Sequence, residues 1–404
     1  EGLEALDDGR VVRVPLGERG ELERVVVEDR RLDERRLERL GEQPVDELAP
    51  GLVVGRVVAA LAHGRAQGRR VGVHPRVDPA RVVMVGSIDG IRVALENYMS
   101  SRGHNEFWVK GGYLQIDKSP INIAALTTLM KYATVKIGHF ENNYGDAHFR
   151  RTDNGQAMYN PFIGSYVLDA FTTEIGSEVY LRKGPWMVMG AISSGEVKGA
   201  VADPKKRSWA KYAKLGFDKK LSETLRVRLT GSGYTTNKSL NQTLFSGDRA
   251  GSRYYEVLVD SVGRDRWSGS IQPGFRNQVT AFQINPFVKI GNAEFFGIIE
   301  TADGRAASEA KDRTINQYAG DLVYRFLDDR LYVGARYNTV NGRLANMTED
   351  VTVKRTQFGG GWFVTPLVLL KAEYVNQKYE DFPTTDIRSG GKFNGFMLEG
   401  VVAF

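Results

Sequence analysis

Apolar and polar residues alternate with a period of two along much of residues 87–404, which is the pattern of strands with two different faces. In 223–236, Leu225, Val227 and Leu229 share one face, whereas Arg226 and Arg228 share the other. The same alternation occurs in 313–326, 329–340, 353–364 and 367–377. These segments predict a sheet with one apolar face and one charged face.

The alternating segments are also unusually long. They measure about 10–14 residues, whereas strands of soluble proteins are commonly about 5–6 residues and a tilted strand that spans a bilayer needs about 9–11. The pattern predicts strands at 90–99, 105–116, 131–143, 173–182, 185–197, 207–219, 223–236, 277–290, 292–301, 313–326, 329–340, 353–364, 367–377 and 392–404.

Short turns and long loops separate these strands in turn. The long loops are 145–172, 198–206, 237–276, 302–312, 341–352 and 378–391. In outer-membrane barrels, short turns face the periplasm, long loops face outward and aromatic residues ring both interfaces. Candidates for these rings are Trp186, Trp209, Tyr324, Phe326, Trp362 and Phe404. The sequence therefore predicts an all-β, transmembrane antiparallel β-barrel of 14–16 strands in the bacterial outer membrane. A large soluble β-protein is the alternative.

Closure of the barrel limits the strand number, because bacterial barrels of this kind have an even count. The segment 90–99 completes fourteen strands and is the expected partner of the last strand, 392–404. Sixteen strands would need two more from residues 1–86, where "GLVVGRVV" and "VVMV" are β-permissive. Phe404 is then expected at the periplasmic interface.

Residues 1–86 differ in composition from the rest of the chain. They contain no Lys, Asn, Ser, Thr, Ile, Phe, Tyr or Trp, although all eight types occur from Ser87 onward. The segment is a charged and partly helical extension, a disordered tail, or an artefact such as a stretch read in the wrong frame, and we favour the artefact. The expected division is thus a foreign segment at 1–86 and a barrel at 87–404, with pore activity independent of 1–86. No nucleic-acid partner is expected, since charge runs are usually solvated.

One strand–loop–strand unit carries a family resemblance. "ATVKIGHFENNYGDAHFRR", followed by "NPFIGSYVLDAFTTEIGSEVYL", resembles the superfamily that includes the phosphate- and polyphosphate-selective porins and related Bacteroidetes-type porins. The resemblance covers roughly 87–404 and implies a sixteen-stranded, usually trimeric barrel with loops folded into the pore. It also implies that the barrel-assembly machinery recognises Phe404. Unlike phosphate-selective members, this chain has no clean run of pore-facing Lys or Arg, so we expect a mild anion preference at most.

Strand alternation assigns the charged side chains to the lumen. The expected basic pore-lining residues are Lys136, Arg182, Lys214, Arg226, Arg228, Lys289, Arg325, Arg336, Arg355 and Lys371. The expected acidic ones are Glu174, Glu178, Glu294, Glu300, Asp321, Glu373 and Glu399. Lining charges and constriction width set pore selectivity. The alternative is that these residues form cross-strand salt bridges that stiffen the wall.

Loop 145–172 is too long for a simple connector, because connections above about 12–15 residues are usually functional or disordered. We expect it to fold into the lumen as a constriction, and the alternative is a loop that stays outside. Its candidate lining residues are Arg150, Arg151, Asp153, Tyr159 and Asp169.

The expected function is a porin for passive diffusion of small hydrophilic or anionic solutes in a Gram-negative outer membrane. The alternative is a non-channel barrel whose long loops bind a ligand or an envelope partner. The five histidines lack metal-ligand spacing and no nucleophile–base set can be assembled, so we expect neither an enzyme nor a cofactor or metal. The expected partners are the lipid bilayer, lipopolysaccharide, the assembly machinery and further copies of the chain.

Overall fold

The computed structural model describes the backbone of residues 2–7, 10–15, 53–61, 76–88, 90–100, 106–151, 157–196, 204–245, 258–259, 266–267 and 269–403. Side chains are described within 90–97, 109–151, 157–196, 204–245 and 269–403. The chain divides into two units, residues 1–47 and 48–404. The first unit contains a hairpin of β1 (Gly2–Asp7) and β2 (Arg10–Pro15).

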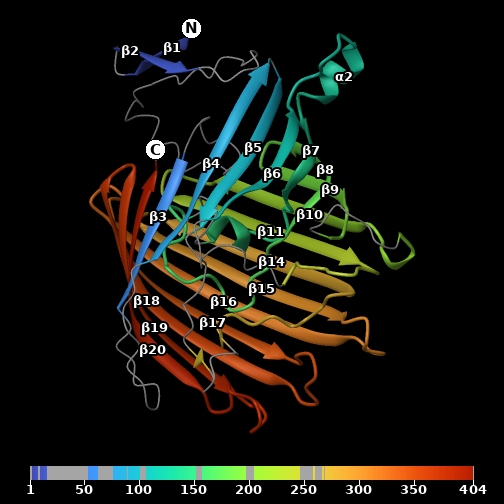
Figure 1. Cartoon of the computed structure of the whole chain (residues 1–404), viewed down its shortest axis with the longest axis vertical. Coiled ribbons are helices and arrows are strands. Elements are labelled where there is room, and N and C mark those ends of the chain that lie inside the picture. The colour runs from blue at the N-terminus through green and yellow to red at the C-terminus, as the bar shows by residue number, and fades with distance from the viewer. Residues whose placement is uncertain are drawn as a thin grey trace. The chain divides into compact units, whose positions relative to one another are not determined.

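The second unit is a closed antiparallel barrel of sixteen strands (Figure 1). Its strands are β3 (Val53–Leu61), β4 (Arg76–Ile88), β5 (Ile91–Ser100), β6 (Glu106–Ile116), β7 (Ala133–Glu141), β8 (Thr173–Lys183), β9 (Trp186–Ser193), β10 (Ala210–Lys220), β11 (Leu225–Thr236), β14 (Gln278–Ile290), β15 (Ala293–Arg305), β16 (Arg313–Phe326), β17 (Leu331–Gly342), β18 (Val351–Thr365), β19 (Val368–Glu380) and β20 (Lys392–Ala403). Closure matters because an unpaired backbone group costs several kcal/mol in hydrocarbon.

The remaining elements are short and lie between barrel strands. They are α2 (Ala124–Leu129), the 3₁₀ helices η2 (Ala147–Arg150) and η3 (Pro204–Lys206), and the paired strands β12 (Leu258–Val259) and β13 (Arg266–Trp267). Within the described ranges, no helix has the length and hydropathy needed to cross a bilayer.

All fourteen strands predicted from alternation are present, and the fold class is confirmed. The structure adds β3 and β4, formed by the two valine-rich stretches before residue 87, so the barrel begins at Val53. β-branched residues favour strands even in a sequence with few aromatic residues. The expectation that the last strand pairs with 90–99 is wrong. β20 pairs with β3, from Phe396 with Leu61 to Ala403 with Val54, while β5 lies between β4 and β6. Phe404 lies outside the described residues.

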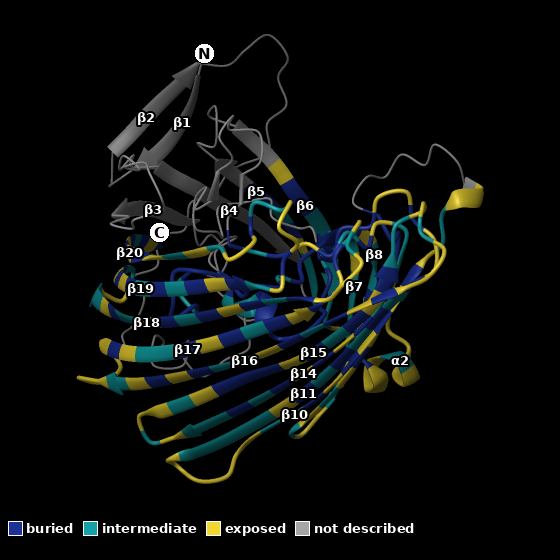
Figure 2. Cartoon of the chain, turned by 90° about the horizontal axis from the view of Figure 1, so that it is seen from below, coloured by how far each residue is buried: buried dark blue, intermediate teal, exposed yellow. Residues whose placement is uncertain are grey.

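The outer face of the barrel is apolar and exposed, whereas the inner face is polar and buried. Leu215, Leu229 and Ile299 are 50–53 % exposed at mid-strand, and alternate positions on the same strands are buried (Figure 2). Trp186, Trp209, Tyr324, Phe326 and Trp362 are exposed near strand ends, as expected for interface rings. A soluble protein buries its apolar side chains and exposes its polar ones. The exposed apolar face of this barrel therefore fits a protein surrounded by a bilayer.

Candidate functional site

Alternation along the strands places the predicted pore-lining charges on the inner face, where they divide into two groups. The partly exposed group is Lys136, Arg182, Arg226, Arg228 and Arg325. The buried group, each at most 3 % exposed, is Lys214, Arg336, Arg355, Lys371, Glu174, Glu178, Asp321 and Glu373. The side chains of the second group are buried because loops cover them.

The inner loop is defined here as residues 142–172, and its described parts, 142–151 and 157–172, lie against the inner face of the barrel wall. The carboxylate of Glu373 accepts hydrogen bonds from the backbone N–H groups of Ile163 (2.6 Å) and Gly164 (3.3 Å). The ammonium of Lys371 donates to the backbone carbonyls of Ala157 (2.8 Å), Asn160 (3.1 Å) and Phe162 (3.1 Å). Lys371 also forms an ion pair of 2.6 Å with Glu399, and both side chains are fully buried.

Neighbouring strands continue the same pattern of wall side chains bound to loop backbone. Asn338 accepts from the N–H of Val167 at 2.6 Å. Gln317 accepts from the N–H of Leu168 at 3.0 Å and donates to its carbonyl at 2.8 Å. Arg355 donates to the carbonyl of Ser165 at 2.6 Å. Side chains of the wall therefore bind the backbone N–H and C=O groups of the inner loop, much as a neighbouring strand would bind them.

A buried charged cluster fixes the middle of the inner loop. Arg336 binds Asp321 through two hydrogen bonds of 2.6 and 2.8 Å and donates to the carbonyl of Gly164 at 2.8 Å. Asp321 also accepts from the hydroxyl of Tyr166 at 2.8 Å. The guanidinium of Arg336 stacks on Tyr166 and Phe162 at 4.0 and 4.4 Å. Such bidentate, stacked geometry is particular to arginine.

Two glycines of the wall make room for an aromatic ring of the inner loop. A Cβ atom at Gly334 would lie 3.2 Å from Phe162 and 2.8 Å from the carbonyl oxygen of Leu322. A Cβ atom at Gly359 would lie 3.5 Å from Phe162 and 3.1 Å from the carbonyl of Ala372. Phe162 is 1 % exposed, so the ring fills the hollow that these glycines leave.

The first turn of the inner loop is tethered on the opposite wall. Asp146 forms ion pairs with Lys214 (2.7 Å) and Arg228 (3.3 Å), and its N–H donates to Asn285 at 2.7 Å. Burial alone would raise the pKa of Asp146, but the ammonium of Lys214 and the guanidinium of Arg228 outweigh it and hold that pKa well below its usual value.

A second loop packs on the inner loop. The N–H of Ile271 donates to the carbonyl of Val167, and the N–H of Phe171 donates to that of Leu244, both at 2.8 Å. Leu168 and Ile271 form a parallel bridge. Parts of loop 237–276 thus join the inner loop, so two loops together cover the inner face.

The predicted constriction residues take different positions. Arg150 stacks over Phe296 at 4.3 Å and lies 3.4 Å from Asp321. Arg151 is buried, pairs with Asp169 and stacks over Phe171 at 4.3 Å. Tyr159 lies in the same loop and has interactions of its own. Asp153 lies outside the described residues.

Four side chains of the wall and Arg150 of the inner loop remain accessible cations on the inner face. We call this set the cationic wall, and its side chains are 15–32 % exposed: Arg150, Arg226, Arg228, Lys289 and Arg325. Arg226 and Lys289 are cross-strand partners, and Arg228 opposes Phe287. The acidic partners of this set are Asp218, Asp146, Glu294, Asp321 and Asp329, of which Asp146 and Asp321 are almost fully buried.

Away from the cationic wall, Lys136 lies 3.7 Å from Glu178, and Arg182 stacks over Tyr180 at 4.6 Å. Glu174 accepts hydrogen bonds from Ser193 and Tyr234 at 2.6 and 2.9 Å. The Lys136–Glu178 and Glu174–Ser193 contacts join neighbouring strands, which is the stiffening role given above as the alternative. Arg182 and Tyr180 lie on one strand, β8, and Glu174 reaches Tyr234 on β11.

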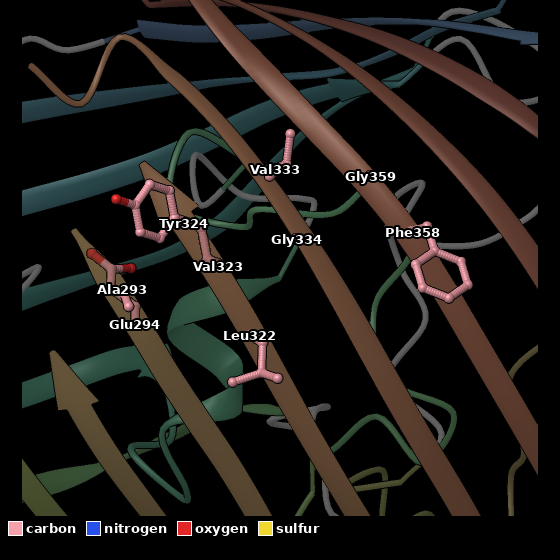
Figure 3. Close-up of a pocket in the computed structure, with 9 residues that line it drawn as sticks. All are labelled: Ala293, Glu294, Leu322, Val323, Tyr324, Val333, Gly334, Phe358 and Gly359. Carbon is pink, nitrogen blue, oxygen red and sulfur yellow. The ribbon is translucent and has the colours of Figure 1, made fainter. Parts of the chain in front are cut away.

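An apolar hollow lies on the wall around β15–β18 (Figure 3). Its exposed side chains are Leu322, Tyr324, Val333 and Phe358, which belong to the outward face. The hollow therefore faces the bilayer and is separate from the lumen. Within the described part of the chain, no cluster of His, Cys, Asp and Glu residues could hold a metal ion.

Comparison with known proteins yields matches of structure only. No family model and no curated protein matches the sequence. The structure is similar to a loop-deletion form of OmpT from Vibrio cholerae, with 14 % identity, 88 % of this chain and 100 % of that chain covered, and a TM-score of 0.52. It is similar to an anion-selective porin from Comamonas acidovorans, with 11 % identity, 87 % and 99 % covered, and a TM-score of 0.53. It is also similar to OprB from Pseudomonas putida, with 12 % identity, 92 % and 96 % covered, and a TM-score of 0.53.

These likenesses concern the fold, and they agree with the closed barrel and its exposed apolar belt. The chain is an outer-membrane β-barrel of porin-like architecture.

Proposed function

We propose that the protein is a passive diffusion channel for small hydrophilic solutes with a mild preference for anions, including phosphate. The observation that carries this proposal is the cationic wall, whose side chains remain partly exposed on the inner face next to the covering loops. Accessible cations raise the local concentration of anions in a pore, because field lines are focused between low-dielectric walls.

The preference is expected to be mild because the cations have partners. Arg226 binds Asp218 through hydrogen bonds of 2.9 and 2.8 Å, and Arg325 binds Glu294 at 2.9 and 3.3 Å. A solute anion therefore competes with carboxylates already in place. Transport rather than catalysis is proposed, with no cofactor.

The test is the reversal potential of purified protein in a planar bilayer under a potassium chloride gradient. We expect stable conductance with a reversal potential shifted toward that of chloride. Arg228→Gln and Arg150→Gln should each reduce the shift. Lys219→Gln is the matched control, because Lys219 is exposed and pairs with Val227 on the outward face. A cation-selective wild type, or equal effects of control and test variants, would contradict the proposal.

The phosphate part of the proposal has its own readout. Added inorganic phosphate should reduce chloride current in the wild type and less so in Arg228→Gln. Chloride current that is insensitive to phosphate would leave a general anion preference and remove the phosphate component.

A second candidate function is a non-channel barrel that binds a ligand or envelope partner through its loops. The extensive burial of wall charges beneath two loops favours it. Folded protein without conductance would support this candidate. By family resemblance we also propose a homotrimer and recognition of Phe404 by the assembly machinery. Lipopolysaccharide is the proposed contact of the outward leaflet.

A further inference from the structure

One connection at the short-turn end of the barrel is unlike its neighbours. The turns 184–185, 221–224, 291–292, 327–330 and 366–367 contain two to four residues. The connection from β6 to β7 spans 117–132 and contains α2. In outer-membrane barrels this end faces the periplasm, where minimal turns suffice. The greater length of segment 117–132 at this end therefore requires an explanation other than the connection of two strands.

Both ends of segment 117–132 are fixed to the barrel. The N–H of Asp117 donates to the carbonyl of Gly90 at 2.8 Å, and Thr134 donates to its carboxylate at 3.1 Å. Gly90 has a φ of +76°, and a Cβ atom there would lie 2.4 Å from the Cβ of Lys118, so the chain crosses this turn closely. At the other end, the N–H of Arg182 donates to the carbonyl of Tyr132 at 2.8 Å.

The middle of the segment is ordered locally but, apart from buried Met130, leaves its large apolar side chains at least partly exposed. The N–H groups of Thr127 and Met130 donate to the carbonyls of Ile123 and Leu126 at 2.8 and 2.9 Å. Ile121, Ile123 and Leu129 are nevertheless 52–53 % exposed, and α2 has no buried residue. Figure 1 shows α2 projecting from the barrel, and Figure 2 shows it exposed.

The base of the segment adjoins the apolar belt of the barrel. Tyr132 is 47 % exposed and lies under the ammonium of Lys183 at 5.9 Å. Lys183 pairs across the hairpin with Trp186, an exposed aromatic residue of the interface ring that packs against Phe217 at 4.9 Å. The exposed apolar side chains thus begin where the lipid-facing surface ends.

We propose that segment 117–132 is an interfacial anchor that inserts Ile121, Ile123 and Leu129 into the periplasmic leaflet of the outer membrane. A short amphipathic segment can lie in the plane of the headgroups with its apolar side chains among the acyl chains. Lys118 and Lys131 supply positive charge at the level of anionic lipid headgroups. The anchor does not depend on what passes through the lumen.

A lipid surface fits this segment better than a protein partner. Stable protein interfaces bury about 800 Å² on each partner and involve about 20–30 residues a side. Segment 117–132 offers four half-exposed apolar side chains, of which only Leu129 belongs to the six-residue helix, and this is far fewer. Insertion into a bilayer requires no such minimum contact area, and the adjacent Trp186 already belongs to the ring of aromatic residues at the bilayer interface.

The chain contains no cysteine, so single cysteines can report the surroundings of one position at a time. Leu129→Cys is labelled with a nitrobenzoxadiazole fluorophore and reconstituted in phosphatidylethanolamine–phosphatidylglycerol vesicles whose acyl chains carry a nitroxide quencher. Leu215→Cys, on the outward face at mid-strand, is the lipid-exposed reference. Glu223→Cys, in the exposed turn 221–224 at the same end, is the water-exposed reference.

We expect quenching of the Leu129 label to approach that of the Leu215 label and to exceed that of the Glu223 label several-fold. Quenching equal to the Glu223 label would overturn the proposal. A Leu129 label that stays in water in lipid vesicles but is shielded in native envelopes would indicate a protein partner and also overturn it. Heat-modifiable gel migration of each labelled variant shows that the barrel is folded, and conductance of the same vesicles tests the channel separately.

Discussion

Lys371 links the inner loop to the barrel wall, and its replacement by methionine tests that link. Lys371→Met removes the counter-charge of buried Glu399 and the donor to three loop carbonyls at once. Leaving one member of a buried ion pair unpartnered costs about 3–5 kcal/mol. A hydrogen bond to a charged group contributes about 1.5–3 kcal/mol net.

These magnitudes decide whether the loop leaves the wall. After the substitution, segment 157–164 is still bound by Glu373 and Arg336 through three hydrogen bonds to Ile163 and Gly164. These bonds involve charged groups, and release of the segment would also expose the buried ring of Phe162, so release costs more free energy than hydration of Glu399 gains. We therefore expect the segment to stay on the wall, with single-channel currents close to the wild-type value, and the unpartnered charge of Glu399 to lower the unfolding temperature.

The double variant Lys371→Met/Glu399→Gln separates charge from contact. It has no unpartnered buried charge, so the unfolding temperature should return toward the wild-type value while conductance stays unchanged. Lys354→Met is the matched control, because the Lys354–Glu380 pair is exposed and such pairs contribute about 0–1 kcal/mol. Planar-bilayer conductance and heat-modifiable gel migration measure both quantities. A wild-type unfolding temperature of Lys371→Met, or no recovery of that temperature in the double variant, would refute the reasoning.

Three further predictions follow from the same contacts. Phe162→Ala should lower the free energy of unfolding by about 3–5 kcal/mol, since a buried ring is lost, whereas Phe358→Ala on the outer face should change it far less in a denaturant titration. The pKa of Asp146 is depressed, so its tether is fully present above the ordinary aspartate value of 3.8 and is lost as pH falls further; the difference in conductance between the wild type and Asp146→Asn should therefore be constant from neutral pH down to that value and shrink below it. Deletion of 1–86 removes β3 and β4 and should abolish the heat-modifiable form, whereas deletion of 1–47 should retain it; equal behaviour of the two deletions would contradict the observed closure.

The sequence predicted the strands well because bilayer-spanning strands alternate strictly. Arg226, Arg228 and Lys371 lie on the inner face as alternation indicates. The two missed strands lie in a segment of atypical composition, where valine was the remaining β signal. The sequence could not show that loop 145–172 would cover half of the predicted lining residues, because that depends on non-local contacts.

Neutral residues were the main omission in the predicted site. Asn338, Gln317 and Asn285 are buried on the inner face and bind the loop backbone, but the predicted lining set contains only charged residues. Their signal in the sequence is a primary amide at an inward position in the middle of a strand. Such a group can donate and accept at once, which a lysine or a glutamate cannot.

The wall holds the inner loop chiefly through the N–H and C=O groups of the loop rather than through loop side chains. Ile163, Gly164, Val167 and Leu168 are all bound in this way. Every residue except proline offers the same two backbone groups. At these four positions the hydrogen bonds of the wall place no demand on the side chain, and side chains there that point away from the wall can be exchanged without redesigning the barrel that carries them.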